Sequence, residues 1–244
     1  MQRSKLTKGR PTVAALLLVA VCGAAAVSAA DSPRANARRS TPYHVQLEAY
    51  PAAPFPFFSK FGTVTLDVYS GGVHAESFWL SGFTRNGSKT ITVQNPVSRM
   101  YTDVPIADVN SIVAKLAGGD QTAGTVPPVM PPVPGKVAGV AANRYRIVYG
   151  PAAWIDVWTA PQITVNPQLR AIVDGLVNGI SPGTATAARG IPGTPIYVEL
   201  NFRRFKKVPL VRLKALTKDN SGEADALKVG SFYFKAPLLD AIWR

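Results

Sequence analysis

Few residues of this chain have the type and spacing that catalysis requires. The only two histidines, His44 and His74, lie alone in strand-like sequence, with no Glu or Cys at metal-ligand spacing. No glycine-rich loop stands between a predicted strand and a predicted helix, where it would cradle a phosphate. We therefore expect no metal, no cofactor and no catalytic residue, and we expect both histidines to be packing or surface residues.

One stretch matches a nucleophile motif. Gly179-Ile-Ser-Pro-Gly183 has the spacing of the nucleophile elbow of serine hydrolases. That elbow needs a strand before the serine and a helix after it, whereas this stretch follows a predicted helix. Its oxyanion hole also uses the backbone N–H of the residue after the serine, and Pro182 has none. Ser181 is therefore predicted to lie in a turn that ends a helix.

A basic run is the clearest charged feature of the sequence. It covers two adjacent predicted strands and their turn, with Arg203, Arg204, Lys206, Lys207, Arg212 and Lys214. Such a hairpin could meet the anionic headgroups of a membrane surface. It could equally form solvated faces that keep the sheet from pairing with other chains. The sequence leaves both readings open.

The N-terminus has the order of a secretory signal peptide. Four basic residues precede an apolar stretch that reaches Val27, and small residues follow it as far as Ala30. We expect residues 1–30 to be removed by cleavage near Ala29 or Ala30; the alternative is a retained membrane anchor. The remaining 23 Lys and Arg against 14 acidic residues leave a net charge of +9. We expect a periplasmic or extracellular protein with no nucleic-acid partner.

The only cysteine, Cys22, lies inside that apolar stretch, so no disulfide is expected in the exported chain. Residues 31–42 carry almost no apolar pattern and are predicted to be a flexible leader. Residues 43–244 are predicted to be one domain. Within it, residues 124–139 are rich in Pro and Val, which predicts an extended loop rather than a helix or a central strand.

Alternation of apolar and polar residues predicts a series of strands separated by turns, the last of them from Leu227 to Phe234. One predicted strand has Val64, Leu66 and Val68 on one face, and another has Trp154, Asp156 and Trp158 on one face. Asn86-Gly87 is the strongest short turn signal. Two segments change to helical spacing: one begins at Pro105 and runs to Leu116, and the other has Asn166 as its cap and runs to Ile180. The predicted fold class is α+β: a curved antiparallel sheet, forming an unclosed barrel, with two main helices covering its concave face.

Four short motifs carry a family resemblance. They are Phe78-Trp79-Leu80, the pair Tyr145-Arg-Ile and Trp154-Ile-Asp-Val-Trp158, Gly193-Thr-Pro-Ile-Tyr-Val-Glu-Leu200, and Ser231-Phe-Tyr-Phe-Lys-Ala-Pro237. From Tyr43 to Pro237 the chain resembles the periplasmic lipoprotein-carrier (LolA/LolB-like) half-barrel superfamily, and is most similar to an uncharacterised exported branch. This resemblance implies an apolar cavity for acyl chains, no cofactor and no catalysis.

The resulting expectation is an exported, non-enzymatic, monomeric protein that binds a lipid or an acylated protein between the sheet and its helices. The candidate wall residues of the cavity are Trp79, Ile106, Val109, Val113, Trp154, Trp158, Leu169, Ile172, Val173 and Leu176. The alternative is a structural or interaction module of the cell envelope, with a filled core and the basic hairpin as its contact surface. A hydrolase whose active site the sequence does not reveal is the third possibility.

Overall fold

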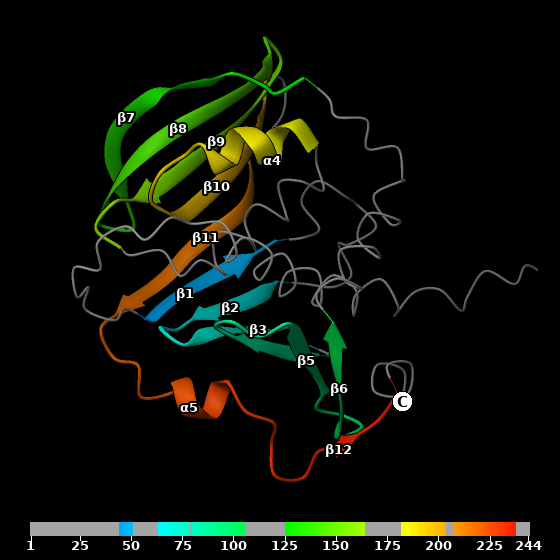
Figure 1. Cartoon of the computed structure of the whole chain (residues 1–244). Helices are drawn as coiled ribbons and strands as arrows, with labels where there is room; N and C mark the ends of the chain where they lie inside the picture. Colours follow the sequence, from blue (N-terminus) through cyan, green and yellow to red (C-terminus); the bar gives the residue numbers. More distant parts are fainter. Residues whose placement is uncertain are drawn as a thin grey trace, which may run out of the picture.

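One twelve-stranded sheet contains nearly all the regular structure of the residues that the structure describes. The computed structural model describes residues 44–50, 63–78, 80–105, 125–163, 182–203 and 207–237. The strands lie in the order β12-β6-β5-β4-β3-β2-β1-β11-β10-β9-β8-β7 (Figure 1). Because β12 and β7 are the two edges and do not pair with each other, the sheet is not closed.

Two meanders make up this sheet, and one strand joins them. The first meander contains β2 (Val64–Val68), β3 (Gly72–Glu76), β4 (Ser81–Arg85), β5 (Thr90–Asn95) and β6 (Met100–Pro105). The second contains β7 (Val129–Val137), β8 (Val140–Gly150), β9 (Ala153–Ala160), β10 (Thr194–Phe202) and β11 (Val208–Thr217). β1 (His44–Ala49) lies between β2 and β11 and is antiparallel to both. β12 (Phe234–Lys235) pairs with β6 in parallel, which makes the sheet mixed.

The predicted α+β class is wrong for the part of the chain that the structure describes. Only two short helices occur there, α4 (Pro182–Arg189) and α5 (Glu223–Ala226), and neither was predicted. The helices predicted from Pro105 to Leu116 and from Asn166 to Ile180 lie outside the described residues, apart from Pro105 itself, which ends β6. The class was misjudged because two main helices were expected to cover the sheet, whereas the described residues form one twelve-stranded sheet, which includes the proline-rich β7 that was expected to be a loop.

The proline-rich stretch is also different from the prediction. Most of residues 124–139 forms β7, which pairs with β8, although the register shifts between Met130 and Val133. Proline lacks the backbone N–H that a central strand needs on both sides. β7 is an edge strand with a neighbour on one side only, so its prolines are tolerated.

Alternation along the strands gives the sheet one apolar face and one polar face. The apolar face contains the largest fully buried side chains, Leu47, Leu66, Ile91, Ile147, Ile155 and Ile196. Helix α4 lies against β8, where the hydroxyl groups of Tyr149 and Thr184 share a hydrogen bond (Figure 1). Among the described residues, neither helix has the length and apolarity needed to cross a bilayer.

Candidate functional site

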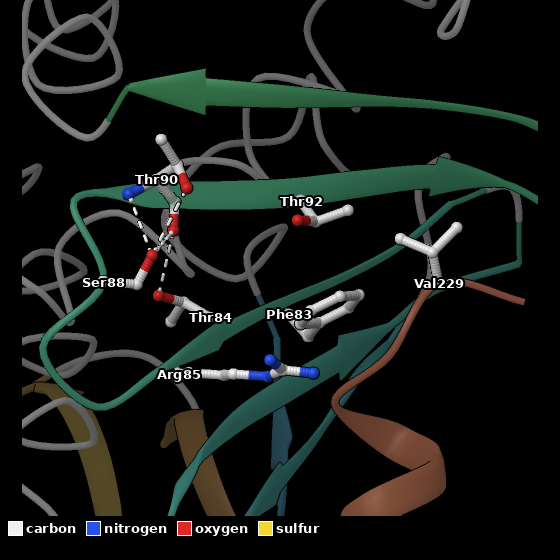
Figure 2. A pocket seen from close by; sticks show the side chains of 7 residues that line it. All are labelled: Phe83, Thr84, Arg85, Ser88, Thr90, Thr92 and Val229. Carbon is white, nitrogen blue, oxygen red and sulfur yellow. Dashed lines mark hydrogen bonds between the residues drawn. The ribbon is translucent and has the colours of Figure 1, made fainter. Parts of the chain in front are cut away.

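A hollow of 310 Å³ lies between the β4–β5 hairpin and the segment that follows α5 (Figure 2). Its lining consists of Phe83, Thr84, Arg85, Ser88, Thr90, Thr92 and Val229. The Arg85 guanidinium donates two hydrogen bonds, of 3.1 and 2.8 Å, to the carbonyl oxygen of Leu227. Five of these seven residues carry a hydroxyl group or a guanidinium, so the hollow offers an acyl chain few apolar side chains.

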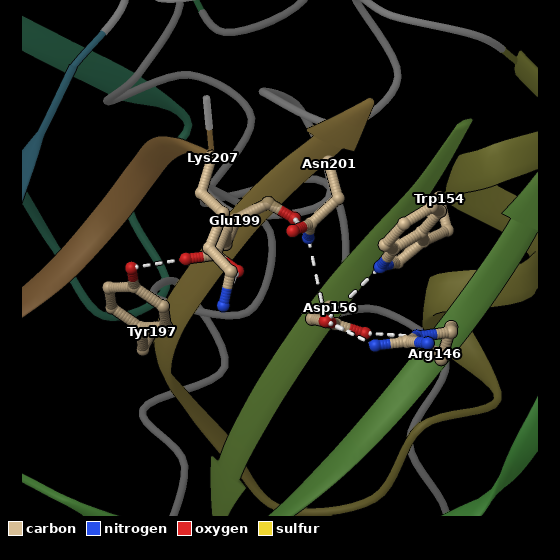
Figure 3. A network of polar contacts seen from close by, with 7 residues as sticks. All are labelled: Arg146, Trp154, Asp156, Tyr197, Glu199, Asn201 and Lys207. Carbon is tan, nitrogen blue, oxygen red and sulfur yellow. Dashed lines mark hydrogen bonds and ion pairs between the residues drawn. The ribbon is translucent and has the colours of Figure 1, made fainter. Parts of the chain in front are cut away.

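A second cluster lies on the polar face of β8, β9 and β10 (Figure 3). Asp156 is 3 % exposed and receives two hydrogen bonds from Arg146, of 2.7 and 2.9 Å. Trp154 Nε1 and Asn201 Nδ2 also donate to Asp156 Oδ2, at 3.3 and 3.4 Å. The carboxylate raises the pKa of Arg146 through these bonds. A buried charge is stable here because four donors and a full counter-charge surround it.

Glu199 lies directly opposite Asp156, on the neighbouring strand β10. It accepts a hydrogen bond of 2.7 Å from the Tyr197 hydroxyl, and Lys207 Nζ lies 3.6 Å from its other oxygen. Burial, followed by the hydrogen bond to Glu199, raises the pKa of Tyr197 to about 12. Two buried carboxylates side by side can serve acid–base chemistry when one oxygen is open to a substrate. Here donors surround Asp156, so the arrangement serves to hold three strands together.

Two of the expected wall residues, Trp154 and Trp158, lie on this polar face. Arg146 lies over the Trp154 ring, 4.8 Å from its centre, and Arg144 over the Trp158 ring at 5.6 Å. The residues of β9 that belong to the apolar core are Ile155, Val157 and Ala160, and Trp158 is partly buried and packs against that core. The alternation of residues along β9 was predicted correctly. Alternation alone does not reveal which face of a strand is buried in the core.

The other eight wall candidates lie outside the described residues: Trp79, Ile106, Val109, Val113, Leu169, Ile172, Val173 and Leu176. Ser181 of the nucleophile-like motif lies outside them as well. The apolar surface that the described residues do provide comes from the strands themselves. Its clearest sequence signal is the alternation of Val64, Leu66 and Val68 along β2.

Two of the four described residues of the basic hairpin form ion pairs with acidic side chains. Arg204 and Lys206 lie outside the described residues, and Arg203 is exposed. Lys207 meets Glu199, and Lys214 Nζ lies 2.9 Å from Glu48. Arg212 lies opposite Glu48 in register. The hydrogen bond from Tyr50, and after it Lys214, lower the pKa of Glu48.

Both histidines, which were predicted to be isolated packing or surface residues, contact the same carboxylate. His44 Nε2 lies 2.8 Å from Asp67 Oδ1, and His74 Nδ1 lies 3.9 Å from Oδ2. The His44 ring also stacks on Tyr69, with ring centres 4.5 Å apart. Burial raises the pKa of Asp67, but its interactions with His74, His44 and Gln46 outweigh burial and leave this pKa below its usual range. Within the described residues, no group of three or more His, Cys, Asp or Glu is arranged to hold a metal ion.

Comparison with known proteins does not assign this chain to a family. No family model matches it, and no curated protein matches it. Among solved structures, it is similar to an uncharacterized conserved protein from Thermus thermophilus, with a TM-score of 0.42 and 8 % sequence identity. That similarity covers 81 % of this chain and 91 % of the other.

Proposed function

We propose that this chain is a non-enzymatic binding protein that holds an acyl chain, of a lipid or of an acylated protein, against the apolar face of its sheet. The observation that carries the proposal is the continuity of that face. Fully buried aliphatic side chains extend from β5 through β2 and β1 to β9 and β8, and the two edge strands do not meet. Each methylene that leaves water for such a surface contributes about 0.8 kcal/mol.

Helix α4 supports the proposal because it makes a thin cover. The residues of this helix that are described as buried are all small: Gly183, Thr184, Ala187 and Ala188. Short side chains contribute little apolar area, so displacing this helix costs less than displacing a helix rich in Leu or Phe. An acyl chain would lie between α4 and the strands behind it.

The proposal is tested by uptake of a fluorescent fatty acid into the purified chain. Ala187→Trp places a large ring on the buried side of α4, and we expect it to reduce uptake at least fivefold. Thr186→Trp places the same ring on the exposed side of the same helix and serves as the matched control. Equal uptake by wild type and both variants, or no uptake by wild type, would contradict the proposal.

A second candidate function is a structural or interaction module with a filled core. One observation favours it: six aliphatic core side chains, Leu47, Leu66, Ile91, Ile147, Ile155 and Ile196, are each less than 2 % exposed. Such a module would bind no acyl probe, and its two α4 variants would behave alike.

A further inference from the structure

Four exposed apolar side chains gather at one end of the first meander, although they come from three separate segments. Phe78 is 80 % exposed, Val97 70 %, Phe232 74 % and Phe234 73 %. We call these four residues the apolar tip. Large apolar side chains exposed singly are common, but a group of four at one end of a sheet is a mark of an interaction surface.

The register of the strands places the apolar tip. Ser81 of β4 pairs with Gln94 of β5, Gln94 pairs with Tyr101 of β6, and Tyr101 pairs with Lys235 of β12. Phe78 precedes Ser81 by three residues, and Val97 follows Gln94 by three. Phe232 precedes Lys235 by three residues, and Phe234 directly precedes it. All four therefore lie just beyond one row of paired residues, which spans about 15 Å because neighbouring strands are about 4.8 Å apart.

Hydrogen bonds hold each segment of the apolar tip in place. In the β3–β4 turn, Ser77 donates to the Leu80 carbonyl from both its backbone N–H and its hydroxyl, at 2.9 and 3.1 Å. In the β5–β6 turn, the Asn95 side chain accepts hydrogen bonds from the N–H groups of Val97 and Ser98, at 2.9 and 3.1 Å. These hydrogen bonds fix the backbone of the two turns that carry Phe78 and Val97.

The C-terminal segment is held in the same way. The Phe234 N–H donates to the Arg99 carbonyl at 3.0 Å, and the Ala236 N–H to the Tyr101 carbonyl at 2.9 Å. Arg99 is itself exposed and lies on the same turn as Val97. The apolar side chains and a guanidinium are thus presented together at the end of the sheet.

We propose that the apolar tip inserts into the surface of a phospholipid bilayer that contains anionic lipids. A bilayer suits apolar side chains that stand apart on separate turns, because acyl chains adapt to each one. The exposed Arg99 complements an anionic headgroup layer, as does the positive net charge, which is +13 for the whole chain and +9 without residues 1–30. This inference goes beyond the proposed acyl binding and does not depend on it.

A fluorescent label placed beside the apolar tip tests the insertion directly. Ser231→Cys in a Cys22→Ser background gives a single exposed labelling site, whether or not the N-terminus is retained. With vesicles of equimolar phosphatidylcholine and phosphatidylglycerol, we expect the emission of an environment-sensitive label to shift to the blue. Lys89→Cys, in the turn at the opposite end of β4 and β5, is the control and should show no shift.

Removing the apolar tip gives the second measurement. Phe232→Ser with Phe234→Ser should weaken vesicle binding of the labelled chain about tenfold or more, because two phenyl rings no longer leave water. Met130→Ser with Val133→Ser removes two exposed apolar residues from the edge strand β7 and should leave binding unchanged. The proposal is overturned if the label at position 231 stays in water, or if the double Phe variant binds as tightly as wild type.

Discussion

Arg146 and Asp156 face each other on β8 and β9 and are joined by two parallel hydrogen bonds of 2.7 and 2.9 Å. The arginine side chain is about one-third exposed, whereas the carboxylate is almost fully buried. The pair is therefore unequal: solvent can replace interactions of the arginine but not those of the aspartate. This asymmetry determines how much free energy of unfolding is lost when Arg146 is replaced.

We expect Arg146→Met to lower the free energy of unfolding by about 2–3 kcal/mol, because Asp156 then stays buried without its counter-charge. The measurement is a urea unfolding curve followed by circular dichroism. Arg144→Met is the matched control, since Arg144 lies over a tryptophan ring on the same strand, and it should cost about 1 kcal/mol or less. If both variants lose the same free energy of unfolding, the pairing of Arg146 with Asp156 adds no stability beyond that of Arg144 over its tryptophan ring.

The raised pKa of Tyr197 predicts a loss of stability at high pH. The unfolded tyrosine ionises near pH 10, whereas the folded one keeps its proton up to about pH 12. Stability from this group is therefore complete below pH 10 and is lost as the pH rises from 10 to about 12. In Tyr197→Phe, this part of the loss of stability between pH 10 and about 12 should disappear. The measurement is the midpoint of urea unfolding at each pH across that range. An unchanged pH profile would contradict the assignment.

The lowered pKa of Asp67 predicts the opposite trend in acid. Its stabilising contribution is complete above its ordinary value near pH 4 and is lost as the pH falls below that value. Asp67→Asn should thus be less stable than wild type at pH 6, and the difference should shrink below pH 4. Asp225→Asn, which changes a fully exposed carboxylate, should differ less from wild type at each pH. A constant difference for Asp67→Asn across this range would refute the prediction.

Close packing between β7 and β9 gives a further prediction. A Cβ added at Gly135 would lie 2.7 Å from the Trp158 ring, so the ring would have to move. Gly135→Ala should therefore lower the free energy of unfolding by about 1–3 kcal/mol. Lys136→Ala, one residue further along the strand and exposed, should change it by about 0.5 kcal/mol or less. If the two variants are equally stable, the tryptophan does not pack over this strand.

Local pattern was sufficient to predict much of the sheet. The alternation of Val64, Leu66 and Val68 predicted β2, and Asn86-Gly87 predicted the β4–β5 turn, where Gly87 has a φ of 77°. Local pattern failed where pairing decides the outcome. The prolines of β7 argued against a strand, yet an edge position tolerates them. The segment from Leu227 to Phe234 alternates like a strand but yields only the start of β12.

The polar clusters were beyond sequence reasoning for the same reason. Trp154, Asp156 and Trp158 were correctly predicted to share one face of a strand. Glu199 lies opposite Asp156 only because β9 pairs with β10. These two strands are far apart in sequence: β9 ends at Ala160, and β10 begins 34 residues later at Thr194. The strand register likewise brings together His44 on β1, Asp67 on β2 and His74 on β3. Single-strand periodicity cannot supply such register.

Acyl binding is tested most directly by native mass spectrometry of the chain purified without detergent, with solvent extraction of the same sample. We predict a mass above that of the polypeptide by one fatty acyl or lipid species, recovered in the extract at about one per chain. A mass equal to the polypeptide alone, with an extract free of acyl species, would contradict the account.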